Sequence, residues 1–183
     1  MLGFLLALIA TVVAGLGARD QVLVAGLAAR QGQRPAVLAI ALVSAALAAA
    51  GAVWVAQAFI PQLAQPARQM LAVLALGLAG LEMLAFSPKP NPAEPTNSLG
   101  AFGIVLLAQQ VIDAARFVLF GIVVASLLPG AAGLGGALGG MAVVAIGWGG
   151  GQALLDLPLR RIRRWLGAVL VLLAAALVLI LRQ

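Results

Sequence analysis

Two pairs of oppositely charged residues lie inside long apolar segments of the sequence. Arg19 and Asp20 lie in the first of these segments, and Asp113 and Arg116 lie in the fourth. An ionised group at the centre of a membrane-spanning helix costs about 2.5–3.5 kcal/mol on insertion scales, so such residues face the interior of a helix bundle and find partners there. These four residues are therefore the best candidates for a site that handles a charged ligand.

The residue types that are missing exclude several classes of chemistry. The 183 residues contain no cysteine, no histidine and no tyrosine. Zinc sites, haem ligation through histidine, Ser-His-Asp triads and thiol redox centres all need histidine or cysteine. The few serine and threonine residues have no neighbouring base that could activate them as nucleophiles. We therefore expect neither an enzyme activity nor a cofactor.

The composition is that of a membrane protein. Hydrophobic residues make up 64% of the chain and charged residues 9%, whereas a soluble domain is about 45–50% apolar and about 25% charged. The net charge of +6 does not indicate a nucleic acid partner, because the basic residues lie in short loops or inside apolar segments. The partners we expect are the lipid bilayer and a small cation or small solute, with homo-oligomer formation left open.

The apolar segments are long enough for six transmembrane helices. A proline-rich segment at 87–98 divides the chain into two blocks, 1–86 and 99–183. Within these blocks, a span needs about 20 residues to cross the hydrocarbon core. Polar and glycine- or proline-containing breaks leave apolar runs near 4–29, 36–59, 67–86, 99–128, 131–155 and 165–181.

The two blocks have the same order of landmarks. An offset of 95 residues aligns helix with helix and places Gln57 on Gln152 and Arg68 on Arg163. An odd number of spans in each repeat forces the two repeats into opposite orientations. We therefore predict an all-α integral membrane protein in which six transmembrane helices form two inverted three-helix repeats, 1–86 and 99–183, joined by a cytoplasmic linker at 87–98.

Several amides accompany the intramembrane charges. We expect the substrate or ion pathway to run past residues of the first and fourth predicted helices, and Asp20 and Asp113 are its candidate metal ligands. The alternative is that the charges only neutralise one another, either through Asp113 and Arg116 at i, i+3 on one helix or across the repeats. The predicted pathway residues are Arg19, Asp20, Gln21, Gln109, Gln110, Asp113 and Arg116.

A cross-repeat arrangement would pair Arg19 with Asp113 and Asp20 with Arg116. Adjacent residues on a helix do not face each other, so Arg19 and Asp20 each need a partner elsewhere. The remaining intramembrane carboxylate, Glu82, lies about one turn from the predicted end of the third helix. There we expect it to reach the membrane interface.

The charged segments resemble the signature of a known family, the six-helix Golgi-type calcium/manganese-proton exchangers and their bacterial relatives in the lysine-exporter superfamily. That signature, Glu-x-Gly-Asp-Lys/Arg-Thr/Ser often followed by Gln, occurs in the first and fourth helices. GLGARDQ at 15–21 is similar to the first copy through Gly17, Arg19 and Gln21. QVIDAAR at 110–116 is similar to the second copy through Asp113, with Gln110 at the position of the glutamate.

The resemblance implies a site of four carboxylates and two cations around a divalent metal ion. The two segments of this chain supply two carboxylates and two arginines, so the formal charge of the site is zero rather than negative. We therefore expect a divergent secondary transporter of the cation/proton exchanger type with a mid-membrane charged site. The alternatives are a non-transporting membrane subunit or scaffold whose site has closed into salt bridges, and an exporter of a small organic solute such as an amino acid.

The distribution of lysine and arginine predicts the orientation. Segments 30–35, 87–98 and 156–164 would lie on one side and together hold seven basic residues, against Arg68 and Arg182 on the other. The positive side is normally cytoplasmic, which places both termini outside the cytoplasm. High alanine, glycine, leucine and arginine with a single lysine indicate a GC-rich bacterial genome, and hence the bacterial inner membrane.

Reporter fusions test this orientation. A reporter inserted after Pro92 is expected in the cytoplasm, and one fused after Gln183 is expected on the opposite side, because three spans lie between them. Alkaline phosphatase and green fluorescent protein fusions at both positions measure this directly. Equal sidedness at the two positions would contradict six spans.

Overall fold

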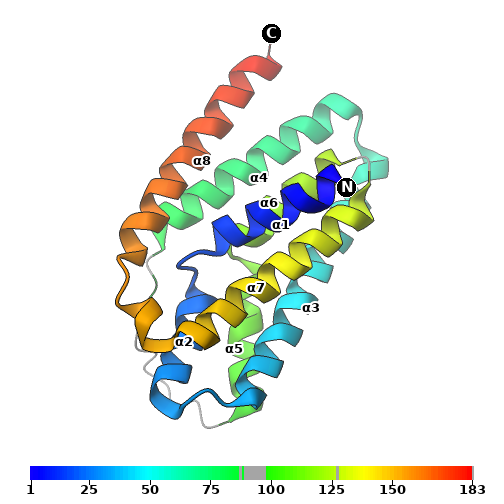
Figure 1. The fold of residues 1–183 in the computed structure, drawn as a ribbon. Coiled ribbons are helices and arrows are strands. Elements are labelled where there is room, and N and C mark those ends of the chain that lie inside the picture. The colour runs from blue at the N-terminus through cyan, green and yellow to red at the C-terminus, as the bar shows by residue number, and fades with distance from the viewer. Residues whose placement is uncertain (87, 89–97, 127, 183) are drawn as a thin grey trace.

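The molecule is a bundle of α-helices (Figure 1). The structure is a computed structural model, and it describes residues 1–86, 88, 98–126 and 128–182. Apart from Pro88 and Ser98, the predicted linker at 87–98 lies outside the described residues. The described residues form eight α-helices and one short 3-10 turn, with no strand. The helices are α1 (Leu2–Gly15), α2 (Arg19–Gln31), α3 (Pro35–Phe59), α4 (Gln65–Ala85), α5 (Leu99–Val111), α6 (Ala114–Ala125), α7 (Pro129–Leu155) and α8 (Leu159–Leu181), and the 3-10 turn is η1 (Ile60–Gln62).

The structure confirms an all-α, multi-span protein. Four helices, α3, α4, α7 and α8, are long and apolar enough to cross a membrane. The pairs α1–α2 and α5–α6 each qualify only as two helices taken together, bent by 64° and 53°. The described residues thus contain four candidate spans, or up to six if each bent pair is one span. Each half contains a bent pair followed by two long helices, and the division into inverted repeats stays a prediction.

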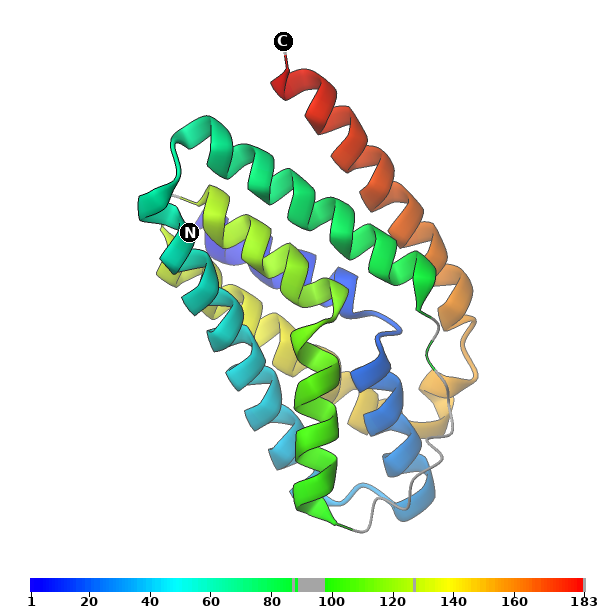
Figure 2. The same ribbon diagram turned by 180° about the vertical axis from the view of Figure 1, so that it is seen from behind.

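The bends correct the prediction of continuous helices in the first and fourth runs. Gly17, between α1 and α2, has φ +68°, a left-handed conformation that glycine adopts without a steric penalty. Between α5 and α6, Asp113 is extended at φ −89° and ψ 152°, and its side chain accepts a hydrogen bond from the backbone N–H of Ala115. Aspartate competes well with helical backbone in this way, so the chain stops and restarts there. Figure 2 shows this second break clearly.

The two halves pack against each other reciprocally. Helix α7 contacts both arms of the first bent pair, α1 and α2, and α3 contacts both arms of the second, α5 and α6. The long helices α3 and α7 also contact each other. Each bent pair is therefore held by a long helix from the other half, and the two breaks lie about halfway along the bundle (Figures 1 and 2).

Glycines allow these helices to approach closely. A Cβ atom added to Gly139 would lie 2.7 Å from the carbonyl oxygen of Leu8 on α1, and one added to Gly147 would lie 2.7 Å from the carbonyl oxygen of Gln21 on α2. Such small-residue faces are the usual basis of tight helix packing in membranes, where no hydrophobic force draws helices together. They determine how closely α1 and α2 pack against α7.

Helices α4 and α8 form a second close pair through Gly80 and Gly167. A Cβ on Gly80 would lie 2.8 Å from the carbonyl oxygen of Gly167, and a Cβ on Gly167 would lie 2.9 Å from that of Gly80. Glu82 follows Gly80 on α4, and Arg163 precedes Gly167 by one turn on α8. The close approach therefore brings these two charged residues together.

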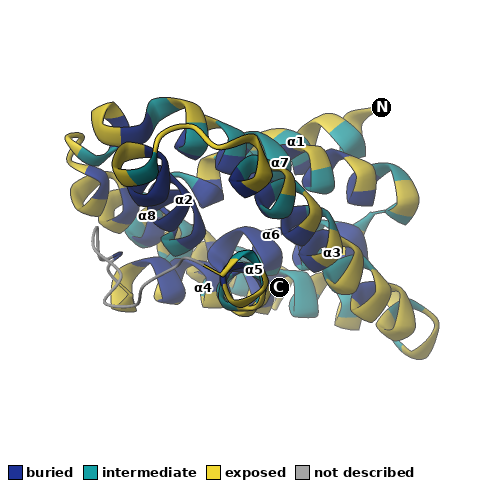
Figure 3. Cartoon of the chain, turned by 90° about the horizontal axis from the view of Figure 1, so that it is seen from below, coloured by how far each residue is buried: buried dark blue, intermediate teal, exposed yellow. Residues whose placement is uncertain are grey.

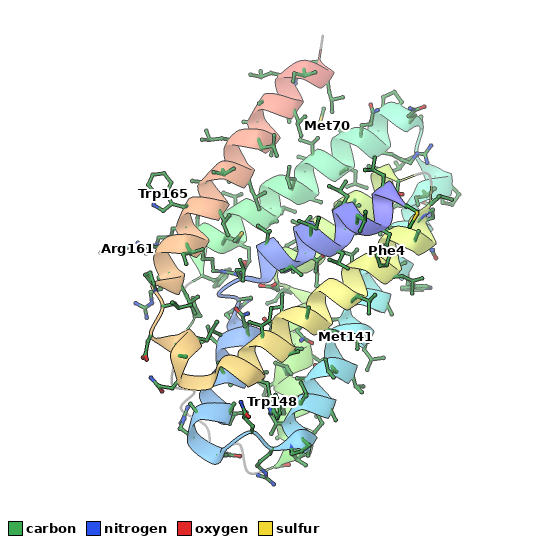
Figure 4. The ribbon with its side chains drawn as sticks, viewed as in Figure 1. Phe4, Met70, Met141, Trp148, Arg161 and Trp165 are labelled. Atoms are coloured by element: carbon green, nitrogen blue, oxygen red, sulfur yellow. The ribbon has the colours of Figure 1, made fainter. Side chains whose placement is uncertain are left out.

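Many large apolar side chains lie on the outer surface, and several polar and charged residues are buried inside the bundle. Figure 3 shows exposed residues along the outer faces of the helices and buried residues towards the centre. Large hydrophobic side chains such as Trp54 and Ile104 are 72% and 73% exposed, as expected for a surface solvated by lipid. Trp165 and Arg161 point away from the bundle on the outer side of α8 (Figure 4), which is typical of residues at a membrane interface.

Substitution of Gly80 tests the α4–α8 contact. Gly80→Ala should destabilise the protein by about 1–3 kcal/mol, because the added methyl group meets backbone atoms that cannot move without shifting a helix. The matched control is Gly51→Ala in α3, where an added Cβ meets nothing within 4 Å; it should leave stability unchanged or raise it slightly. Thermal unfolding of the purified proteins in detergent measures both, and equal midpoints for the two variants would contradict a tight contact at Gly80.

Candidate functional site

The two helix breaks carry most of the predicted pathway residues. Arg19 is the first residue of α2, and Asp20 and Gln21 follow it in the first turn. Asp113 is the N-cap of α6, and Arg116 lies in the first turn of that helix. Each bent pair therefore presents a helix N-terminus, with its unpaired N–H groups and positive end of the dipole, to the middle of the bundle. Asp20, Gln21, Asp113 and Arg116 are all buried.

A chain of ion pairs joins α2, α4 and α8 to the N-cap residue of α6. Arg163 on α8 is 1% exposed, and its Nη2 donates hydrogen bonds to Oε2 of Glu82 on α4 and, at 3.0 Å, to Oδ1 of Asp113. Arg19 Nη2 lies 3.5 Å from the other oxygen of Glu82, and its guanidinium lies 4.8 Å from the centre of the Phe86 ring. We call Arg19, Glu82, Arg163 and Asp113 the closed network. It contains two cations and two carboxylates, so its formal charge is zero.

The closed network corrects the expected pairing. Arg19 contacts Glu82 rather than Asp113, and Asp113 contacts Arg163 rather than Arg19 or the side chain of Arg116. Within the described residues, Asp20 and Arg116 have no ion pair at 4.0 Å or less. The cross-repeat pairing was therefore wrong, because Arg163 enters from α8 and takes the carboxylate that Arg19 was expected to bind.

Sequence reasoning missed Glu82 and Arg163 as site residues. Glu82 was placed at the membrane interface and Arg163 in a basic loop, but they are 6% and 1% exposed. Arg163 lies inside α8, which begins at Leu159. A signal was present in the sequence, because each residue lies within one turn of a glycine, Gly80 or Gly167, and a small residue on the same helix allows a neighbour to approach closely.

Asp20 is held outside the closed network. Its Oδ2 accepts a hydrogen bond from Nε2 of Gln110 at 3.1 Å, and its Oδ1 accepts one from the backbone N–H of Gln21 at 2.7 Å. Gln110 lies on α5, so this contact joins the two halves across the breaks. Asp20 is thus a buried carboxylate, 5% exposed, whose described partners are neutral.

Gln21 closes the first break. Its side-chain oxygen accepts a hydrogen bond from the backbone N–H of Gly17 at 2.8 Å, and its side-chain nitrogen donates one to the carbonyl oxygen of Val143 on α7 at 3.2 Å. Backbone groups freed by a break cannot be solvated by lipid and need such partners. Gln21 therefore acts as a structural support for the site. Gln109 is half-buried, and its side-chain oxygen has no hydrogen-bond partner among the described residues.

Arg116 has an unusual environment for a buried cation. It is 4% exposed, and its Nη2 donates a hydrogen bond to the carbonyl oxygen of Ala45 on α3 at 3.3 Å. Its Nε and Nη1 have no hydrogen-bond acceptor among the described residues. Arg116 and Asp20 attract each other through their charges without direct contact. We call Asp20 and Arg116 the open pair.

The described residues offer no ready metal centre. They contain no group of three or more Asp, Glu, His or Cys side chains placed to hold a metal ion together. Asp113 is engaged by Arg163 and by the N–H of Ala115, and Asp20 by its two amide partners. The assignment of Asp20 and Asp113 as metal ligands stays a prediction.

No protein-family model matches the sequence, and no similar curated protein or solved structure is found. The interpretation of the site therefore depends on its own geometry and chemistry.

Loss of Arg163 should be costly, because it leaves the buried carboxylate of Asp113 without a cationic partner and leaves Glu82 with the longer contact to Arg19 alone among the described residues. Arg163→Ala is expected to destabilise the protein by about 3–5 kcal/mol. The neighbouring Arg164→Ala removes the same charge from an exposed position on the same helix and should have little effect. Thermal unfolding in detergent compares the two, and adding Asp113→Asn to Arg163→Ala should restore part of the lost stability by neutralising the stranded charge. If Arg163→Ala and Arg164→Ala unfold alike, Arg163 does not hold the network together.

Proposed function

We propose that the protein is a secondary transporter of the cation/proton exchanger type, with its substrate site at the junction of the two helix breaks. One observation carries this proposal: two bent helix pairs, one from each half, meet at a buried cluster of charged residues. Transporters commonly place their sites at such breaks near the bilayer midplane, where half-helix ends line the binding position. Buried charges in a membrane protein are costly and mark functional positions by default.

The reciprocal packing of the halves supports the inverted-repeat scaffold on which the proposal depends. When two related halves each contact the bent helices of the other, the halves can pack together in two nearly equivalent arrangements. Alternating access in inverted-repeat transporters is a change between two such arrangements around a fixed site. The resemblance of the charged segments to the Golgi-type exchangers agrees with the same scaffold, and the basic segments still favour cytoplasmic loops once the buried Arg163 is discounted.

Asp20 is the group we assign to proton coupling. A carboxylate in contact with arginine strands that cation when it takes up a proton, whereas one with neutral partners can gain and lose a proton without stranding a cation in direct contact. Asp113 and Glu82 contact Arg163, whereas the described partners of Asp20 are amide groups. A proton carried by Asp20 would alter its hydrogen bond with Gln110, and thereby the contact between α2 and α5.

The charge balance of the site bears on its substrate. The closed network and the open pair each have a formal charge of zero, so a dehydrated divalent cation would meet no excess of negative charge. Calcium and manganese prefer several oxygen ligands, mostly carboxylates. The open pair instead favours the second candidate function, export of a small organic solute such as an amino acid, whose own opposite charges would match Asp20 and Arg116.

A third possibility is a membrane subunit or scaffold that does not transport. The closed network is the observation that favours it, because ion pairs between α4, α6 and α8 stabilise one arrangement of the helices. The open pair argues against it, since a purely structural site gains nothing from leaving a buried aspartate and a buried arginine out of contact.

A flux assay in proteoliposomes tests the proposed function. Vesicles with an internal pH indicator are exposed to sodium, potassium, calcium, manganese and amino acids, with and without a pH gradient. We expect solute-dependent proton movement, smallest for calcium and manganese, that is lost in Asp20→Asn and kept in the control Asp156→Asn, which changes an exposed carboxylate at the end of α7. Absence of proton movement with every solute would favour the non-transporting scaffold, and robust calcium or manganese exchange would show that formal charge misjudges the substrate.

A further inference from the structure

The guanidinium group of Arg116 is buried without an anionic partner in contact. Within the part of the chain that the structure describes, no carboxylate oxygen lies within 4.0 Å of its nitrogens, and one backbone carbonyl, that of Ala45, accepts a hydrogen bond from it. A buried unpaired charge is strongly unfavourable, as are buried donors without acceptors. The other buried arginine, Arg163, shows the contrast, since it contacts two carboxylates.

The position of this guanidinium is built by three helices. Helix α6 carries Arg116, and α3 supplies the carbonyl oxygen of Ala45. Helix α7 contributes Gly140, where an added Cβ atom would lie 2.7 Å from Nη1 and 2.8 Å from Nη2 of Arg116. The missing side chain at Gly140 therefore leaves the space that the end of the guanidinium occupies.

The nearby carboxylates do not neutralise Arg116 by contact. Asp20 and Asp113 both attract it electrostatically. Asp20 is held by Gln110 and by the N–H of Gln21, and Asp113 is held by Arg163 and by the N–H of Ala115. The Nε and Nη1 donors of Arg116 consequently have no acceptor among the described residues and are available to a ligand.

We propose that Arg116 binds the carboxylate group of a small ligand at the junction of α3, α6 and α7. The planar guanidinium matches the two oxygens of a carboxylate, and such pairs form short, charge-assisted hydrogen bonds. Gln110 donates a hydrogen bond to Asp20, whose charge attracts Arg116, and among the described residues Oε1 of Gln110 has no hydrogen-bond donor. These two acceptors suit an ammonium group, so the carboxylate belongs either to a simple organic acid or to an α-amino acid.

This inference rests on the proposed function. Arg116 is so deeply buried that a ligand reaches it only when the protein opens towards one side of the membrane, as a transporter does. Its test is nevertheless a binding measurement that does not depend on flux. The purified full-length protein in detergent is unfolded thermally, and the unfolding midpoint is followed by tryptophan fluorescence during titration with sodium acetate or glycine. Sodium chloride at matched ionic strength and methylammonium chloride serve as controls.

We expect a saturable rise of the midpoint with acetate, glycine or both, about 3–5 °C at ten times the Kd. A rise with both shows that the carboxylate is sufficient, and a rise with glycine alone shows that the ammonium group is also recognised. No saturable rise with either, or an equal rise with sodium chloride or with methylammonium chloride, overturns the proposal.

Three variants locate the binding. Arg116→Lys keeps the charge but not the planar fork, and should weaken the affinity about ten- to hundredfold. Gly140→Ala should also weaken it, because the added methyl group occupies the place of the guanidinium. Arg164→Lys makes the same exchange at an exposed position of α8 and should change nothing. Unchanged affinity in Arg116→Lys and Gly140→Ala would place the ligand elsewhere and refute the assignment.

The stability of a fourth variant separates ligand binding from a structural role. Without ligand, Arg116→Met should unfold at the same temperature as the unsubstituted protein or higher, because it removes an uncompensated buried charge. A large loss of stability would show that Arg116 already has its structural partner. Carboxylate binding without any solute flux would count against the transporter and not against the binding site, whereas flux without carboxylate binding would count against this inference alone.

Discussion

The arrangement of the helices depends on one buried guanidinium, that of Arg163. It contacts a carboxylate on α4 and the residue that caps α6, so a single side chain links the last helix of each half to the break in the second bent pair. The electrostatic requirement behind this is strict, because an ionised group in the low-dielectric interior is tolerated only in contact with an opposite charge or with well-oriented dipoles. The glycines at 80 and 167 make the contact possible by bringing α4 and α8 together.

The breaks in the two bent pairs obey the same requirement at the level of the backbone. A helix that stops in mid-membrane frees N–H and C=O groups that lipid cannot satisfy. At the first break the side chain of Gln21 bonds on both sides, to Gly17 and to Val143, and at the second the carboxylate of Asp113 accepts the N–H of Ala115. Residues that the sequence predicts as ligand-binding residues are therefore partly engaged in stabilising the helix breaks, where a ligand could bind.

The sequence predicted much of the fold, because apolar run length and proline-rich breaks are direct consequences of bilayer thickness. It also placed Asp20, Gln110, Asp113 and Arg116 in one neighbourhood, through the cost of charge in hydrocarbon. It did not predict the helix breaks, since one depends on the left-handed conformation of Gly17 and the other on the side chain of Asp113 accepting a hydrogen bond from the backbone N–H of Ala115. Nor did it predict the partners, because pairing follows from the angle at which α8 meets α4, and Arg163 looked like one of several arginines in a basic loop.

The closed network has a consequence for how the protein is made. Its members enter the membrane in chain order, and the first half brings Arg19 and Glu82, which neutralise each other without help from later helices. Asp113 has no such companion until Arg163 arrives, 50 residues further along the chain. During synthesis, Asp113 therefore lacks its cationic partner until α8 enters the bilayer. Insertion of α8 is in turn favoured by the carboxylates of Glu82 and Asp113, which are already in the membrane and can pair with Arg163.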